Sequence, residues 1–162
     1  MATTKTRKKP AQQNDAISLL KKDHEKVRGL LSKLERAAQR NTAKAEELLE
    51  QIDHEVKIHS QIEEEIFYPA FRDAARKHDD RELYFEAKEE HHVVDLVMPE
   101  VRETDSDAEE FAAKAKVLKE LIEHHADEEE KEMFPKARKL LDRGELRELG
   151  ERMKERKKEL GG

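Results

Sequence analysis

Apolar residues recur at spacings of three and four through the first half of the chain, which is the periodicity of an amphipathic helix. A first helix is predicted to end near Arg40, and Asn14 or Asp15 can cap its start. A second helix is predicted to start with Thr42 as its cap, and Pro69 is expected to bend or interrupt it. The apolar faces consist of Ile17, Leu20, Val27, Leu31, Leu34, Ile52, Val56, Ile62, Ile66 and Phe67.

The second half of the chain carries the same periodicity. Asp79 followed by Glu82 resembles a capping box and predicts the start of a third helix. Ser106 followed by Glu109 predicts the start of a fourth in the same way, and Gly144 is expected to end that segment. The apolar faces here consist of Leu83, Ala87, Val94, Met98, Val101, Phe111, Ala115, Leu118, Leu121 and Ile122.

Four long helices with short connections predict an all-α fold, an antiparallel up-down-up-down four-helix bundle. We expect the bundle over residues 14–142, after a basic, disordered tail over residues 1–13. Residues 143–162 are predicted to form a short extra C-terminal helix, so charged that it packs loosely or mediates self-association. Charged residues make up 44% of the chain, which also fits a disordered protein, but the helical periodicity favours the bundle.

The composition limits which binding partners and which cellular compartment are expected. A net charge of −6 argues against a nucleic-acid-binding surface. The absence of cysteine excludes disulfides, thiolate metal sites and cysteine nucleophiles. No apolar run approaches the roughly 20 residues of a membrane span, and the N-terminus lacks the apolar core of a signal peptide. We therefore expect a cytoplasmic monomer or weak homo-oligomer with no nucleic-acid or membrane partner.

An internal repeat relates the two halves of the chain. Residues 59–72, HSQIEEEIFYPAFR, align with residues 125–138, HADEEEKEMFPKAR, and residues 23–31, DHEKVRGLL, align with residues 90–98, EHHVVDLVM. Each half is therefore a helix hairpin in which an acidic residue and His are followed by a His-x-x-x-Glu motif. The alignment pairs His24 with His91, His59 with His125, Glu63 with Glu129, Glu64 with Glu130, and Pro69 with Pro135.

Each of the four long helices places one imidazole among the apolar positions of its buried face, and two of them add a carboxylate one turn on. A single buried His is usually a hydrogen-bonded core residue, but four in a duplicated pattern favour a metal site. Burying these groups is costly without compensation, and no Lys or Arg shares their faces at these levels. Two cations would compensate them, and the donor set suits iron, zinc, copper or manganese. The candidate metal ligands are His24, His59, Glu63, His91, His125 and Glu129.

Other titratable residues near the motifs fall off these faces. Surface or boundary positions are predicted for His54, His78, His92 and His124. Since His54 and His124 are close in sequence to candidate ligands, a hydrogen bond to a ligand is the alternative for them. Glu64 and Glu130 lie about 100° round the helix from the ligand carboxylates, so we predict a solvated face; they replace those ligands if the register is off by one. Glu55, one turn before a candidate ligand, is predicted to lie at the core boundary.

These motifs resemble the hemerythrin-like family, the HHE cation-binding domain. The residues that carry the resemblance are DH at 23–24, HSQIEE at 59–64, FYP at 67–69, EH at 90–91, HADEEE at 125–130 and MFP at 133–135. The resemblance covers nearly the whole bundle. It implies a four-helix bundle with two Fe ions in an oxo- or hydroxo-bridged di-iron centre. Family members bind O2, and some respond to nitric oxide, peroxide or iron.

The chain departs from the oxygen-carrying hemerythrins at two positions. Those carriers have a further His one turn before the ligand of the third helix, where this chain has Ala87. They also use Asp where this chain offers Glu129. The missing imidazole is expected to leave an open or water-filled position on one iron, which favours reaction with O2 or peroxide over reversible oxygen storage.

The resulting hypothesis is a non-haem di-iron protein that binds O2, peroxide or nitric oxide and reacts with it, in oxidative or nitrosative stress handling or sensing. Peroxidase-like, catalase-like or O2-reducing turnover would fit. One alternative is a metal or oxygen sensor, or a helical interaction module, without turnover. A lesser alternative is a ferritin-like iron oxidase or store, which needs two Glu-x-x-His motifs where this chain has one, Glu89 and His92. The chain contains no nucleophile elbow and no phosphate-binding loop.

Overall fold

The computed structural model of the protein describes residues 14–162, so the expected N-terminal tail lies outside the described residues. Within them every regular element is helical, and the all-α prediction is confirmed. The elements are α1 (Ala16–Ala38), α2 (Thr42–Ile62), η2 (Glu63–Phe67), α3 (Tyr68–Ala74), α4 (His78–Glu103), α5 (Glu109–Glu128), η3 (Glu129–Met133), α6 (Phe134–Leu140) and α7 (Arg143–Glu159).

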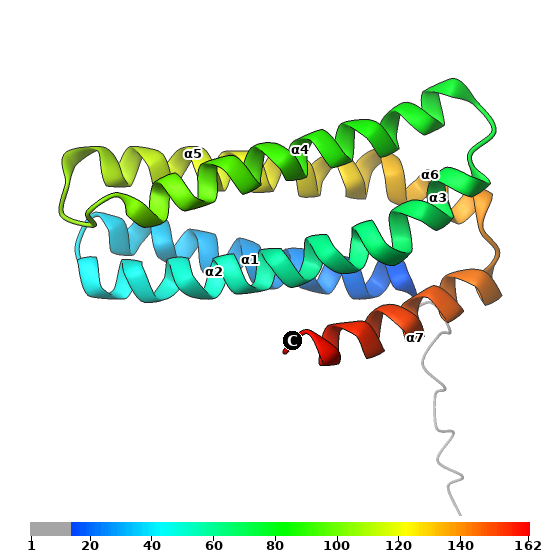
Figure 1. The fold of residues 1–162 in the computed structure, drawn as a ribbon, viewed down its shortest axis with the longest axis horizontal. Coiled ribbons are helices and arrows are strands. Elements are labelled where there is room, and N and C mark those ends of the chain that lie inside the picture. The colour runs from blue at the N-terminus through cyan, green and yellow to red at the C-terminus, as the bar shows by residue number, and fades with distance from the viewer. Residues whose placement is uncertain (1–13) are drawn as a thin grey trace, which may run out of the picture.

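Four long columns form the bundle (Figure 1). The first is α1, the second is the unbroken run of α2, η2 and α3, the third is α4, and the fourth is the unbroken run of α5, η3 and α6. Successive columns run in opposite directions, and α1 packs on α2 and α5 while α4 packs on α5 and α2. None of the helices between residues 14 and 162 is long and apolar enough to span a bilayer.

The second and fourth columns contain a single π turn each, and in the second column this turn is the interruption of the α-helix expected at Pro69. The amide of Tyr68 donates to the carbonyl of Glu63, five residues back, and the amide of Phe134 donates to the carbonyl of Glu129. A proline has no amide hydrogen to donate and its ring crowds the carbonyl four residues before it. The wider π turn just before Pro69 and Pro135 lets each helix continue through the proline.

The first helix begins as predicted and the second begins one residue earlier than predicted. The Asp15 side chain accepts from the amide of Ser18, so Asp15 is the cap of α1. The cap of α2 is Asn41, whose side chain accepts from the amide of Lys44, and Thr42 is already helical. Both caps satisfy amide groups that the first helical turn leaves without a partner.

The two capping boxes predicted for the second half are wrong. Helix α4 begins directly after Lys77 and α5 directly after Ala108, and neither of these residues makes a side-chain cap. The hydroxyl of Ser106 instead donates to Glu46 across the bundle end, at 2.7 Å. A capping box does form at α7, between Asp142 and Glu145. Gly144 therefore lies in the first turn of α7 and does not end the preceding helix.

Two apolar clusters fill the bundle, with a polar layer between them. One cluster lies towards α3, α6 and α7 and includes Phe67, Phe71 and Phe134. The other lies towards the α1–α2 and α4–α5 connections and includes Leu34 and Phe111. The polar layer consists of buried His and Glu side chains from all four columns.

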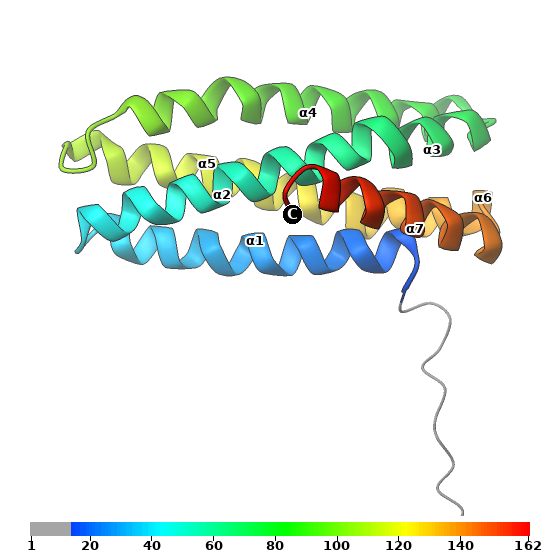
Figure 2. The same cartoon turned by 60° about the horizontal axis from the view of Figure 1, so that its bottom comes forward.

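The C-terminal helix α7 packs firmly, contrary to the expectation of loose packing. It lies along α1 and α2 on the outside of the bundle (Figure 2). Leu146, Leu149 and Met153 on one of its faces are buried in the same cluster as Ile17 and Leu20 of α1. The sparse apolar residues of α7 thus share one stripe, and the charged residues cover the rest.

Candidate metal centre

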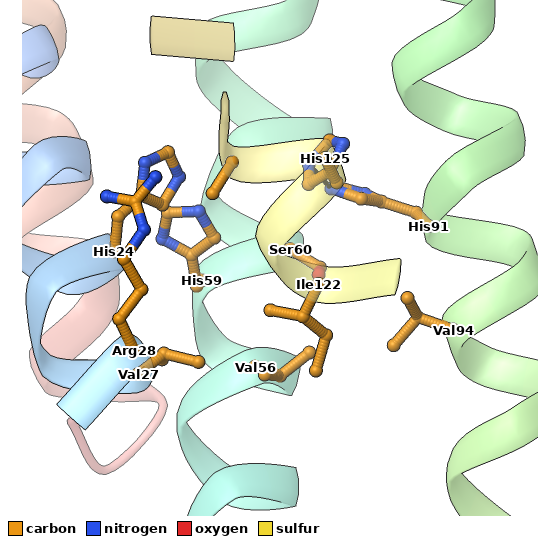
Figure 3. Close-up of a pocket in the computed structure, with 11 residues that line it drawn as sticks. His24, Val27, Arg28, Val56, His59, Ser60, His91, Val94, Ile122 and His125 are labelled. Atoms are coloured by element: carbon orange, nitrogen blue, oxygen red, sulfur yellow. Dashed lines mark hydrogen bonds between the residues drawn. The ribbon is translucent and has the colours of Figure 1, made fainter. Parts of the chain in front are cut away.

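All six candidate ligands meet in the polar layer, and each is exposed by 8% or less. Each long column contributes one imidazole, and the two carboxylates stand at the first residues of η2 and η3. Figure 3 shows the imidazoles as two pairs. We call His24 and His59 the first pair, and His91 and His125 the second pair. Ligand atoms within 4.8 Å of one another form two groups, His24, His59, Glu63 and Glu129 on one side and Glu63, His91 and His125 on the other.

Each carboxylate contacts one imidazole from each pair. Oε1 of Glu63 lies 2.9 Å from Nε2 of His59 and 3.4 Å from Nε2 of His91. Oε1 of Glu129 lies 3.3 Å from Nε2 of His24 and 3.0 Å from Nε2 of His125. Both carboxylates therefore lie between the pairs, where each can span two cations.

Several buried atoms of this layer lack a hydrogen bond of normal geometry. They are Nε2 of His24, Nε2 of His59, both carboxylate oxygens of Glu63 and Oε1 of Glu129. In the second pair, the Nε2 atoms of His91 and His125 lie 3.0 Å apart. If both rings were neutral with their hydrogens on Nδ1, two lone pairs would face each other, and a proton or a metal ion between them would relieve the repulsion. Two nitrogens about 2.1 Å from one ion and at right angles also lie about 3.0 Å apart, so the donor set fits a metal.

A second carboxylate holds the outward nitrogen, Nδ1, of every imidazole. The four residues, which we call the outer carboxylates, are Asp23, Glu64, Glu90 and Glu130. Nδ1 of His24 lies 2.9 Å from Glu130, that of His59 3.2 Å from Asp23, that of His91 2.8 Å from Glu64 and that of His125 2.9 Å from Glu90. Donation from each Nδ1–H fixes the ring and leaves the Nε2 lone pair for the centre.

The prediction of a solvated face for Glu64 and Glu130 holds in part, at Glu64. Glu64 is exposed and Glu130 is partly buried, but both also accept from an imidazole of the neighbouring column. Arg28 also donates to Glu130, at 2.9 Å. The internal repeat held the signal, because Glu64 pairs with Glu130 and Asp23 pairs with Glu90.

Tyr68 belongs to the centre, and helical periodicity missed it. Its hydroxyl donates to Glu129 at 3.1 Å and lies 3.1 Å from Nε2 of His91 and 3.4 Å from Nε2 of His125. The π turn of η2 brings this residue, five positions after Glu63, onto the interior face. The hydroxyl of Tyr68 thus lies against both imidazoles of the second pair.

A small cavity of about 30 Å³ adjoins both imidazole pairs. Besides the four imidazoles, the lining is mostly aliphatic, with Val27, Val56, Val94 and Ile122, and it also includes Arg28 and Ser60 (Figure 3). A space of this size holds one small molecule. Its aliphatic wall offers few hydrogen bonds, so the cavity suits a small apolar molecule better than a strongly hydrated one.

The family model of the Hemerythrin HHE cation binding domain matches residues 15–137. The chain belongs to this family. The match spans all four columns of the bundle and ends before α7. The prediction from the motifs is thereby confirmed at the level of the family and of cation binding.

Similar proteins agree with this membership of the HHE family. The chain is 30% identical over 149 residues to the "Uncharacterized protein Rv2633c" of Mycobacterium tuberculosis, covering 91% of this chain and 88% of that protein. The crystal structure of an HHE cation binding domain-containing protein from Mycobacterium kansasii, a homolog of Rv2633c, matches with a TM-score of 0.79 at 29% identity. That match covers 90% of this chain and 86% of the other. A DNA nickase of Nostoc is 27% identical over 116 residues, which are 72% of this chain and 31% of the nickase.

Charges within the metal-free HHE domain favour the protonated form of His59, His91 and His125. Burial opposes the charged form of His59, but neighbouring carboxylates, with Glu63 foremost, outweigh it and raise the pKa to about 10. The pKa values of His91 and His125 are raised against burial in the same way. Burial opposes the charge of Glu129 too, but its imidazole neighbours hold its pKa well below the usual range. Protons thus supply the positive charge that metal ions would otherwise bring.

The remaining histidines lie outside the centre. His78, His92 and His124 are exposed, as predicted. His54 is exposed and lies 3.3 Å from the carbonyl of Gly161, so it contacts the end of the chain and no candidate ligand. His124 lies 3.5 Å from Glu90 and so reaches the centre only through an outer carboxylate.

Two further expectations concern carboxylates. Glu55 is half-buried and pairs with Lys26 at 2.5 Å, which agrees with the predicted boundary position. Glu89 and His92, the only Glu-x-x-His pair that was found, are both exposed on α4 and face away from the polar layer. A ferritin-like ligand set is therefore not present at this pair.

Proposed function

We propose that this HHE domain is a non-haem di-iron protein that binds O2, peroxide or nitric oxide and reacts with it, in the handling or sensing of oxidative or nitrosative stress. One observation carries the proposal. Glu63 and Glu129 each contact an imidazole of both pairs, which is the arrangement expected of carboxylates that span two metal ions about 3.5–4 Å apart.

The chain's own residues have distinct roles in this proposal. The first pair would hold one iron and the second pair the other, with Glu63 and Glu129 between them. The hydroxyl oxygen of Tyr68 is a further donor on the side of the second pair. The outer carboxylates orient the imidazoles, and the two apolar clusters exclude bulk water from the layer between them.

The cavity beside the imidazoles supports a small, uncharged ligand. When bound, a pair of iron ions supplies electrons and open coordination positions to an oxidant or a diatomic gas. Val27, Val56, Val94 and Ile122 keep this space apolar, so O2 or nitric oxide can collect there without competing with many ordered waters.

Metal analysis of purified protein reconstituted with ferrous iron tests the ligand set. We expect two irons per chain, and a clear loss of iron in Glu129→Ala. The matched control is Glu132→Ala, an exposed carboxylate of the same π segment. One zinc per chain, or equal iron in the two variants, would contradict the di-iron assignment.

The reaction needs a separate test. Anaerobic ferrous protein is mixed with O2, hydrogen peroxide or nitric oxide, and the visible absorption and the consumption of each reagent are followed. We expect new absorption with at least one of them. Consumption beyond one equivalent would indicate turnover, and absorption change without consumption would favour the alternative of a sensor. No change with any reagent would refute the reactivity.

A further inference from the structure

Helix α7 lies beyond the residues that match the HHE family, yet it contacts the metal-bearing part of the bundle. It runs beside α1 and α2 and reaches η2 (Figure 2). The approach is closest at Gly150, where an added Cβ would lie 2.8 Å from the backbone nitrogen of Ala16. A helix seated this closely is a fixed part of the domain surface beside the first pair.

Lys157 of α7 is connected to the candidate ligand His59 through Asp23. Its ammonium group donates to Oδ1 of Asp23. The other oxygen of Asp23, Oδ2, accepts from Nδ1 of His59 at 3.2 Å. Asp23 is 7% exposed, so bulk water screens neither contact fully. The position of Lys157 therefore affects the carboxylate that orients His59.

A second contact joins α7 to the segment that carries Glu63. Nε of Arg156 donates to Glu65 at 2.7 Å, and Glu65 lies in η2 two residues after Glu63. The end of α7 thus contacts the neighbours of two candidate ligands, one on α2 and one on η2. Both ligands belong to the group around the first pair.

The second pair has no such connection in the described part of the chain. The outer carboxylates of His91 and His125 are Glu64 and Glu90, which lie within the bundle's own columns. The outer carboxylate of His24, Glu130, takes its cation from Arg28 of α1. Asp23 is therefore the outer carboxylate whose cation comes from outside the four-column bundle.

We propose that α7 is a positioning element for the metal centre, and that Lys157, acting through Asp23, sets how firmly the metal ion at the first pair is held. The proposal rests on the proposed function, since it assumes that the first pair binds metal. With the ammonium group in place, Asp23 keeps one orientation and the ring of His59 is fixed. Without it, a buried carboxylate loses its cation, and Asp23 and His59 become free to rotate.

Release of iron to a strong chelator tests this proposal on the full chain. The variant is Lys157→Met, and the matched control is Lys158→Met, which removes the same charge from the next, exposed residue. We expect one of the two iron equivalents to leave roughly tenfold faster in Lys157→Met, the lower end of the effect seen for partners of metal ligands. The other equivalent should leave at the wild-type rate. Lys157→Arg should restore slow release, because Arg keeps the charge.

Two results would overturn the proposal. One is release of both equivalents from Lys157→Met at the rate of Lys158→Met. The other concerns Asp23→Asn: if Lys157→Met speeds release as much in that background as in the wild type, Lys157 does not act through Asp23. Unfolding of the metal-free variants is measured alongside, and equal midpoints for Lys157→Met and Lys158→Met exclude a general loss of stability. Wild-type protein that holds no iron would instead refute the proposed function itself.

Discussion

One difference between the two halves of the centre is a hydroxyl group. In the internal repeat Tyr68 aligns with Phe134. The ring of Phe134 stacks on His24 with centroids 5.8 Å apart, while the ring of Tyr68 lies 5.3 Å from that of His91. The two aromatic rings thus cover the two imidazole pairs in matching positions, but an oxygen reaches the centre on the second side only.

Tyr68→Phe tests what this oxygen contributes. The ring stays and the hydroxyl goes, so we expect the free energy of unfolding to change by about 1 kcal/mol. The iron at the second pair should be held roughly tenfold more weakly. The control is Tyr84→Phe, whose ring packs edge-on against that of Tyr68. Equal iron affinity in the two variants, measured by competition with a chelator, would show that the hydroxyl is not a ligand.

Imidazole protonation predicts how the stability of metal-free protein depends on pH. The pKa of His59 is raised from 6.5 to about 10 in the fold. A raised pKa stabilises the fold fully below the unfolded value, and this stabilisation is lost as the pH rises through the folded value. Urea unfolding of metal-free protein should therefore show stability that falls between about pH 6.5 and 10. Iron affinity should rise with pH over the same window, because metal displaces protons. A metal-free stability that is flat or rising there would contradict the proton positions.

Individual residues of the centre were predictable to different degrees. The six candidate ligands follow from apolar periodicity, because the structure places each of them on an interior face. The outer carboxylates do not follow from apolar periodicity. A residue next to a ligand in the sequence lies about 100° round the helix from it, and only the packing of the next column decides whether its side chain meets solvent or an imidazole. The assignment of the six residues as ligands stays a prediction.

At the scale of elements, the π turns were not predicted from the sequence. Pro69 and Pro135 signal a break, yet both helices continue, because the turn ahead of each proline is widened. The extra residue also changes which side chains face inward after it. The caps of α4 and α5 were also predicted wrongly. Asp79 and Ser106 are residue types that commonly cap helices, but these helices begin after Lys77 and Ala108.

Deleting one residue from a π turn should turn it into an α turn, and the ring of the proline that follows would then crowd the carbonyl four residues before it. Deleting Glu132, an exposed residue of η3, would place Pro135 after such an α turn and disturb the segment that carries buried Phe134 and Ala137. We expect a loss of several kcal/mol in unfolding free energy and of iron binding. Deleting Asp107, exposed in the α4–α5 connection, should have a much smaller effect. If urea unfolding and metal analysis show similar losses for both deletions, the π turn has no special role in stability or iron binding.

At the scale of the whole molecule, α7 is integrated with the bundle through its close approach at Gly150. Gly150→Ala places a methyl group against the backbone of Asp15 and Ala16. We expect destabilisation by about 1–3 kcal/mol, typical of an overpacked contact. Gly29→Ala is the control, because nothing lies within 4 Å of its added Cβ, and it should stabilise the protein by about 1 kcal/mol. Thermal and urea unfolding of both variants distinguish these signs, and equal stability of the two would mean that α7 is less tightly seated.

The outer carboxylates also share one direction around the bundle axis. Asp23 and Glu90 precede a ligand on α1 and α4, which run one way, while Glu64 and Glu130 follow a ligand on the columns that run the other way. Because every α-helix is right-handed, one step back on an ascending helix and one step forward on a descending helix turn to the same side. All four carboxylates therefore reach for the next column in one direction around the axis. In a bundle of the opposite handedness, each acidic residue would have to stand on the other side of its ligand in the sequence. The order of the two residues, Asp-His or His-Asp, therefore depends on the handedness of the topology.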